Sequence, residues 1–95
     1  MTIANLRKYE MNKKYPLAYK AGQQLKALRL QQGYTITNFA YLLNVSAQQL
    51  FRYERGVNRI DIDTLIRGLI LLNVKLDEFF ALLIAVDQDL QSKVD

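Results

Sequence analysis

The stretch from Ser46 to Gly56, SAQQLFRYERG, combines the signals of a short helix with side chains that can hydrogen-bond to bases. Ser46 is a residue type that caps the start of a helix, and Gly56 is one that follows its end. Counted around a helix from Ser46, Gln48 and Arg52 lie four positions apart on one outward face. Glutamine pairs bidentately with adenine and arginine with guanine. The face is therefore either ordinary solvated surface or a surface that reads bases; in isolation the first is favoured, and a helix-turn-helix arrangement around it would favour the second.

Neighbouring positions of the same stretch extend this hypothesis. Gln49 is either a further base contact or the second half of a capping box with Ser46. Phe51 either contacts thymine methyls or folds back onto a neighbouring helix, and the sequence does not decide between these. Ala47 is small enough to meet a thymine methyl. The predicted base contacts are Ala47, Gln48, Gln49 and Arg52.

The composition argues against catalysis. The 95 residues include no cysteine and no histidine, which excludes disulfides, thiolate nucleophiles and the usual zinc and imidazole chemistry. Ser46 and Ser92 have no evident base, no pair of carboxylates shares a predicted face, and no glycine-rich loop could cradle a phosphate. We predict that the chain is not an enzyme and needs no metal, cofactor or small-molecule ligand.

Charge is distributed unevenly along the chain. Residues 1–60 hold ten Lys and Arg but only two acids, for a net charge of +8, whereas residues 61–95 carry a net charge of −4. A basic first part suggests a polyanionic partner, either nucleic acid or an anionic membrane; the alternative is a solvated surface on which the charges cluster by chance. No apolar run is long enough to span a membrane, and the basic N-terminus lacks the apolar core of a signal peptide, so we expect a cytoplasmic protein.

The elements that must position the stretch are helices. Leucines and alanines at helical spacing predict a first helix from about Leu17 to Gln32, with Gly33 after it. Three more helix starts repeat one pattern, in which a polar cap follows an apolar residue that can pack on the next turn. These caps predict helices over about 35–43, 46–55 and 61–72, and a last helix is predicted over about 76–91. The caps are Thr35, Ser46 and Asp61; the apolar stripe of the first helix is Leu17, Ala21, Leu25, Leu28 and Leu30.

Two of these helices, joined by the short Asn44-Val45 turn, form a helix-turn-helix arrangement, in which the second helix enters the major groove of DNA. The segment LKALRLQQGYTITNFAYLLNVSAQQLFRYERGVNRIDIDTL resembles the Cro/repressor-type helix-turn-helix family, also called the Xre family. The match covers roughly residues 22–80. It includes the Leu-x-x-Leu-Arg pattern that ends at Arg29, the Glu-Arg-Gly signature at Glu54, and the ending LLNVKLDEFF.

The resemblance implies an all-α, five-helix, lambda-repressor-like domain that regulates transcription by binding double-stranded DNA. It also implies a buried ion pair between Arg29 and Glu54. The narrower motif SxQQxxRYERGxNRI resembles small regulators associated with fimbrial operons of enterobacteria, which often repress motility genes. An alternative is an antitoxin or partner-binding module of the same fold.

Contacts to the phosphate backbone are expected from hydroxyls near helix starts and from polar residues that flank the recognition helix. The first group is Thr35, Thr37 and Ser46, and the second is Arg55, Asn58 and Arg59. Residues 1–16 form either a basic arm, which could extend this footprint, or a short helix.

The last predicted helix carries more apolar residues than one core contact requires. We predict that this helix forms a homodimer contact, since symmetric operators suit two-fold proteins; the alternative is that the N-terminal segment covers it in a monomer. The chain thus divides into residues 1–16, a helix-turn-helix domain over 17–80, and an extension of the last helix over 81–95. The predicted interface residues are Phe79, Phe80, Leu83, Ile84, Val86 and Leu90.

Overall fold

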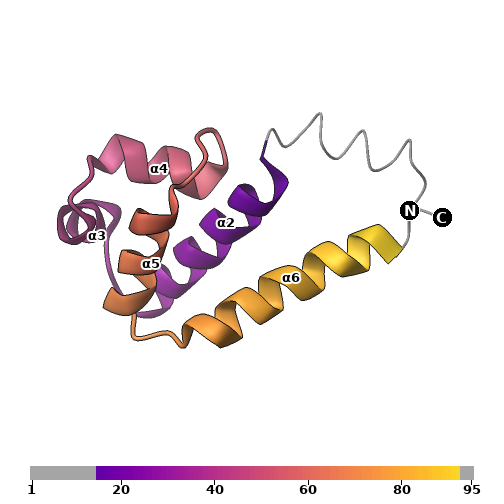
Figure 1. Cartoon of the computed structure of the whole chain (residues 1–95). Coiled ribbons are helices and arrows are strands. Elements are labelled where there is room, and N and C mark those ends of the chain that lie inside the picture. The colour runs from indigo at the N-terminus through magenta and orange to yellow at the C-terminus, as the bar shows by residue number, and fades with distance from the viewer. Residues whose placement is uncertain (1–14, 93–95) are drawn as a thin grey trace.

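The computed structural model describes residues 15–92, and this part of the chain consists of five helices without a strand (Figure 1). The predicted all-helical fold is therefore confirmed. The predicted contributions of residues 1–14 and 93–95 lie outside the described residues. The helices are α2 Pro16–Gln31, α3 Ile36–Leu43, α4 Ala47–Arg55, α5 Ile62–Leu71 and α6 Leu76–Ser92.

Side-chain caps begin three of the helices at the positions that the sequence predicts. The hydroxyl of Thr35 accepts a hydrogen bond from the backbone N–H of Asn38, at 3.0 Å, before α3. Ser46 accepts one from Gln49 N–H, at 3.0 Å, before α4. Asp61 accepts one before α5. Each cap satisfies a backbone donor that the first turn leaves unpaired.

The ends of α3 and α4 depend on left-handed backbone conformations. Asn44 has a φ of 61° in the turn between the two helices, and Gly56 has a φ of 74° after α4. Asparagine and glycine adopt this conformation at low cost, so the chain can reverse direction within very few residues. The short turn fixes α4 relative to α3.

The helices enclose one core. Its fully buried large side chains come from α2, α3, α4 and α5, with a further contribution from Leu72 just after α5. Two residues of the predicted α2 stripe do not join this core: Leu17 is 47% exposed and Leu30 is 56% exposed. The buried residues of α2 are Ala21, Gly22, Leu25 and Arg29, and at 100° per residue Leu30 lies on the opposite side of the helix from Ala21. The largest fully buried residues are Leu25, Phe39, Leu43, Leu50, Leu69 and Leu72.

Helix α2 is central to the packing and contacts α4, α5 and α6, while α3 packs against α4 and α5. Two side chains tie helix ends across the core: Gln32 Nε2 donates to the carbonyl of Leu72 at 2.7 Å, and Arg67 donates to the carbonyl of Leu43 at 2.9 Å. Helix α6 runs along one side of the body and continues beyond it (Figure 1). Among residues 15–92, no helix combines the length and apolarity needed to cross a membrane.

Candidate nucleic-acid interface

Helix α4 presents two opposed faces. Its buried face consists of Leu50, Tyr53 and Glu54. The opposite face is exposed and carries amide, guanidinium and aromatic groups, so this helix can contact a large partner without disturbing the core. The exposed residues are Gln48, Phe51, Arg52 and Arg55.

A close approach of two backbones fixes α4 on α2. A Cβ atom at Gly22 would overlap the carbonyl oxygen of Tyr53 and would lie 3.0 Å from its carbonyl carbon and 3.2 Å from the Cα of Glu54. Only a residue without a side chain allows this separation. The position and tilt of α4 therefore depend on glycine at position 22.

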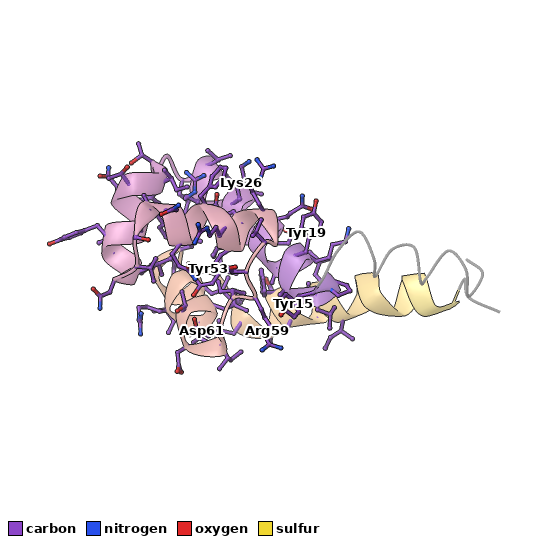
Figure 2. The ribbon with its side chains drawn as sticks, turned by 90° about the horizontal axis from the view of Figure 1, so that it is seen from above. Tyr15, Tyr19, Lys26, Tyr53, Arg59 and Asp61 are labelled. Atoms are coloured by element: carbon purple, nitrogen blue, oxygen red, sulfur yellow. The ribbon has the colours of Figure 1, made fainter. Side chains whose placement is uncertain are left out.

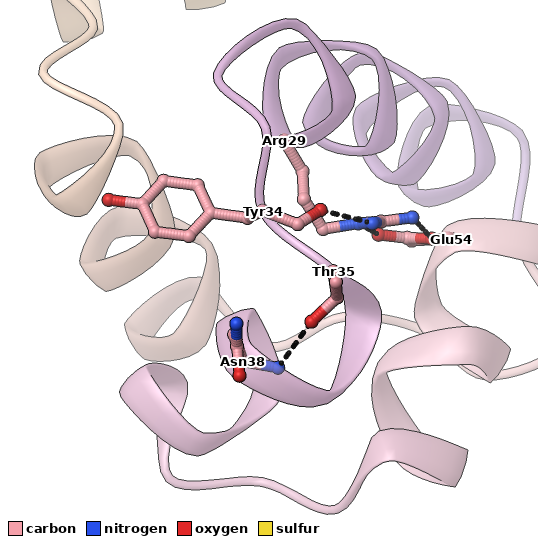
Figure 3. A network of polar contacts seen from close by, with 5 residues as sticks. All are labelled: Arg29, Tyr34, Thr35, Asn38 and Glu54. Carbon is pink, nitrogen blue, oxygen red and sulfur yellow. Dashed lines mark hydrogen bonds and ion pairs between the residues drawn. The ribbon is translucent and has the colours of Figure 1, made fainter.

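A buried ion pair joins the same two helices (Figure 3). Arg29 Nε donates to one carboxylate oxygen of Glu54 at 2.7 Å, and a terminal nitrogen of Arg29 donates to the other oxygen at 3.1 Å. The remaining terminal nitrogen of Arg29 donates to the carbonyl of Tyr34 at 2.8 Å. The structure thus brings together the pair that the family resemblance implies, and links it to the start of α3. No buried side-chain polar atom among the described residues lacks a partner.

The loop after α4 is held to α4 through Asp61, the cap residue of α5. The hydroxyl of Tyr53 donates to Asp61 at 3.3 Å, and Asp61 also accepts from the backbone N–H and the hydroxyl of Thr64. Hydrogen bonds from the Thr64 backbone and then the Thr64 side chain lower the pKa of the Asp61 carboxyl, burial opposes them, and the hydrogen bond from Tyr53 adds a smaller lowering effect. The carboxylate of Asp61 thereby couples α4 to the start of α5.

The predicted base contacts are not equivalent. Gln48 and Arg52 are exposed on the outward face of α4, whereas Ala47 and Gln49 are half-buried. Asn58 Nδ2 donates to Gln49 Oε1 at 3.2 Å. The side-chain oxygen of Gln49 is therefore bound to the loop after α4. A full capping box would instead require this oxygen to accept from the backbone N–H of Ser46.

The hydroxyl-bearing candidates for phosphate contact lie near helix starts. Thr35, Thr37 and Ser46 are exposed. The hydroxyl oxygens of Thr35 and Ser46 accept from the backbone as caps, which leaves each hydroxyl hydrogen able to donate to another acceptor. Ile36, between two of these residues, packs partly against the core and offers no polar group.

The two arginines at the end of α4 and in the following loop each lie over an aromatic ring. The guanidinium carbon of Arg55 is 5.1 Å from the centre of the Phe51 ring, and that of Arg59 is 4.9 Å from the centre of the Tyr15 ring. Figure 2 shows Arg59 beside Tyr15 at the start of α2. A guanidinium held against a ring in this way keeps its positive charge and its N–H donors, which can bind a phosphate or a base.

The ion pairs of the described residues are Arg29–Glu54 and an exposed pair, Lys75–Glu78, at 3.9 Å. Arg52 and Arg55 therefore have no carboxylate partner among the side chains of residues 15–85. Since the one acid of α4 is buried with Arg29, the outward face of this helix is positively charged.

Three contacts at this interface are absent from the sequence-based prediction. They are the Arg55–Phe51 stack, the Arg59–Tyr15 stack and the Asn58–Gln49 hydrogen bond. The spacing of four residues between Phe51 and Arg55 is a local signal for the first. The other two join residues that only the folded chain brings together.

The predicted dimer residues of α6 divide between core and surface. Phe79 is 6% exposed and belongs to the chain's own core, which leaves it little surface for a partner. Phe80 and Leu83 are partly buried against that core, and Phe80 meets Phe79 edge-on at 5.4 Å. Ile84 is 52% exposed. Val86 and Leu90 lie outside the residues whose side chains are described.

The geometry defines a helix-turn-helix unit whose second helix carries an exposed polar and basic face. In agreement, a family model described as Helix-turn-helix matches residues 25–79, more than half of the chain. The chain belongs to this family, which confirms the coarser part of the resemblance drawn from the sequence.

Known proteins are similar to this chain over part of its sequence. A protein of Pyrococcus horikoshii named as an HTH-type transcriptional regulatory protein is 41% identical over 46 residues, which are 48% of this chain and 15% of that protein. One of Rickettsia prowazekii named as an HTH-type transcriptional regulator is 36% identical over 59 residues, 62% of this chain and 45% of that protein. The chain thus spans less than half the length of these curated relatives. Their names are those of regulators rather than enzymes, in agreement with the prediction from composition that the chain is not an enzyme.

A solved structure supports the fold. The crystal structure of the clp gene regulator ClgR from Corynebacterium glutamicum superposes with a TM-score of 0.67 and covers 80% of each chain. At 24% identity, this likeness concerns the fold alone.

Proposed function

We propose that this chain is a sequence-specific regulator of transcription that binds double-stranded DNA. The observation that carries the proposal is the construction of α4. One face of α4 is locked to α2 by Gly22 and by the Arg29–Glu54 pair, and the other presents Gln48 and Arg52 to solvent. A rigid helix with unpaired amide and guanidinium groups fits the width and the hydrogen-bonding pattern of the major groove.

Contacts to phosphates would set the register of this helix. Thr35 and Ser46 present hydroxyls near the starts of α3 and α4, and Arg55 and Arg59 present guanidinium groups near the end of α4. Arginine contacts to phosphate supply affinity that depends on salt but not on sequence. Gln48 and Arg52 would supply the discrimination between bases.

The test begins with selection of duplexes from a random pool by the full chain, followed by titration of the selected duplex and of a scrambled one. Arg52→Ala should weaken binding to the selected duplex by about 1–3 kcal/mol and relax its sequence preference. Lys75→Ala removes an equal charge at the start of α6 and should have little effect on either duplex. Equal loss on both duplexes in Arg52→Ala would contradict a base-reading role.

Arg59 should behave differently because its role is contact to phosphate. Arg59→Ala should weaken binding to all duplexes and reduce the slope of log affinity against log salt by about one. An unchanged slope would remove Arg59 from the phosphate-contacting set.

We further propose that two copies act together, through α6, on an operator with two-fold symmetry. The two recognition helices would then enter major grooves about 34 Å apart. The apolar residues that α6 leaves exposed, among them Ile84, support this proposal. We also propose that the protein acts in the cytoplasm. The SxQQxxRYERGxNRI motif favours the finer hypothesis that it controls fimbrial or motility genes.

A further inference from the structure

Phe51 is a large aromatic residue on an otherwise polar surface. It is 48% exposed and lies on the outward face of α4, between Gln48 and Arg52 in sequence. The buried face of the same helix is complete without it, since Leu50 and Tyr53 supply the core contacts. Folding of the core therefore does not explain why an apolar ring is exposed at this position of α4.

The contact that Phe51 does make is with Arg55, one turn later. The guanidinium carbon lies 5.1 Å from the ring centre, within the range of a cation–π interaction. Within the described residues, Arg55 has no carboxylate partner, because Glu54 is bound to Arg29. The ring is thus the group that holds this guanidinium on the outward face.

Holding an arginine side chain in place before binding reduces the conformational entropy that it loses when it contacts a partner. A free arginine side chain has several rotatable bonds, and fixing them on binding opposes the contact. A guanidinium already held against a ring has lost part of that freedom while it keeps its positive charge and its N–H donors. An acid would fix it equally well but would neutralise the charge that attracts a phosphate.

We infer that Phe51 is a positioning residue, which holds Arg55 ready for contact with DNA phosphate. The inference rests on the proposed function, because it assigns a role within that interface. It replaces a direct role for Phe51, in which the ring would touch a thymine methyl.

The experiment is a double-mutant cycle on the duplex selected by the wild-type chain. Affinity and its salt dependence are measured for wild type, Phe51→Leu, Arg55→Ala and the double variant. Phe51→Leu keeps an apolar side chain but removes the π face. Phe51→Tyr restores the face and serves as the matched control.

We expect Phe51→Leu to weaken binding about two- to fivefold in the wild-type background and hardly at all when Arg55 is alanine. Phe51→Tyr should bind like wild type. Arg55→Ala should lower the salt slope by about one, whereas Phe51→Leu should leave the slope unchanged because the charge remains. Because Phe51 is not part of the core, all variants should keep the melting temperature of the wild type within a few degrees.

Two results would overturn the inference. The first is an equal cost of Phe51→Leu with arginine or alanine at position 55, since the ring would then act independently of Arg55. The second is a cost that disappears on a duplex in which deoxyuridine replaces thymidine, since the ring would then read the methyl group. If the wild-type chain selects no duplex at all, the proposed function fails, and this outcome is distinct from the other two.

Discussion

Gly22 in α2 lies directly against the carbonyl group of Tyr53 in α4, so that the backbones of the two helices touch. The contact lies next to the buried Arg29–Glu54 pair, which joins the same helices through side chains. Together they determine how far α4 stands from the body and in which direction its exposed face points. The exposed face of α4 is thus positioned by buried residues on the opposite side of the helix.

Replacing Gly22 by alanine should destabilise the protein by about 1–3 kcal/mol, because the added Cβ atom meets backbone that cannot move away cheaply. Helix propensity alone predicts the opposite sign, a gain of about 1 kcal/mol. The free energy of unfolding in urea, followed by circular dichroism, distinguishes these expectations.

Gly68→Ala is the matched control. Gly68 is also a buried glycine within a helix, but its added Cβ would meet the side-chain tips of Leu25 and Leu43, at 3.2 and 3.5 Å. Those tips can shift, so this variant should lose less stability than Gly22→Ala. Equal stability of Gly22→Ala and wild type would refute the role of the close approach.

Breaking the buried ion pair from one side should be costly. Glu54→Leu leaves the guanidinium of Arg29 without a carboxylate in a buried position, which should cost about 3–5 kcal/mol. Part of the cost could be recovered by removing the second charge, because two apolar side chains of similar volume often replace a buried pair without loss.

The double variant Arg29→Met with Glu54→Leu tests this explanation. It should be more stable than Glu54→Leu alone, although it also loses the hydrogen bond from Arg29 to the Tyr34 carbonyl. Urea denaturation of the two single variants and the double variant gives the coupling energy. Strictly additive losses would mean that the two charges do not stabilise each other.

Asp61 should contribute a pH-dependent part of the stability. Its pKa is lowered in the folded chain, chiefly by the Thr64 backbone, so the unfolded chain binds the proton more tightly. Stability from this group is therefore fully present above about pH 4, the ordinary range of an aspartate, and is lost as the pH falls through the lower folded value.

Asp61→Asn separates the charge from the cap. Asparagine caps a helix about as well as aspartate, so this variant should remain folded but lose that acid-dependent part of the unfolding free energy. Asp61→Ala should lose the cap itself, about 1 kcal/mol at neutral pH. Unfolding free energies between pH 2 and 7 provide the measurement, and identical pH profiles for Asp61→Asn and wild type would argue against the shift.

Local signals account for most of what the sequence predicts correctly. The caps Thr35, Ser46 and Asp61 determine where helices begin, and Asn44 and Gly56 determine where two of them end. These signals act over three or four residues, so they can be read without the tertiary structure. The prediction that Leu17 and Leu30 face the core fails for two reasons: Leu17 lies beside the part of α2 that neighbouring helices cover, and Leu30, five residues after Leu25, points about 140° away from it.

The candidate nucleic-acid interface was predictable only in part, because sequence signals act over only a few neighbouring residues. Outward positions such as Gln48 and Arg52 follow from counting around one helix. The partner of Gln49 lies nine residues away, and the ring under Arg59 is 44 positions earlier in the chain. Such contacts depend on how α2 and the loop after α4 pack, which no local pattern encodes.

Ile84 provides the test of assembly. An apolar residue that is 52% exposed on α6 should become buried if two copies pair through this helix. Ile84→Glu should then shift the chain toward monomer, measured by sedimentation equilibrium, and should weaken binding to the selected duplex without changing the fold. Ala85→Glu adds the same charge to the same helix about 100° around its axis from Ile84, away from the predicted interface residues, and should leave assembly unchanged. If Ile84→Glu sediments like wild type, the two-fold contact must lie elsewhere, because a charge inside an apolar seam cannot be accommodated without loss.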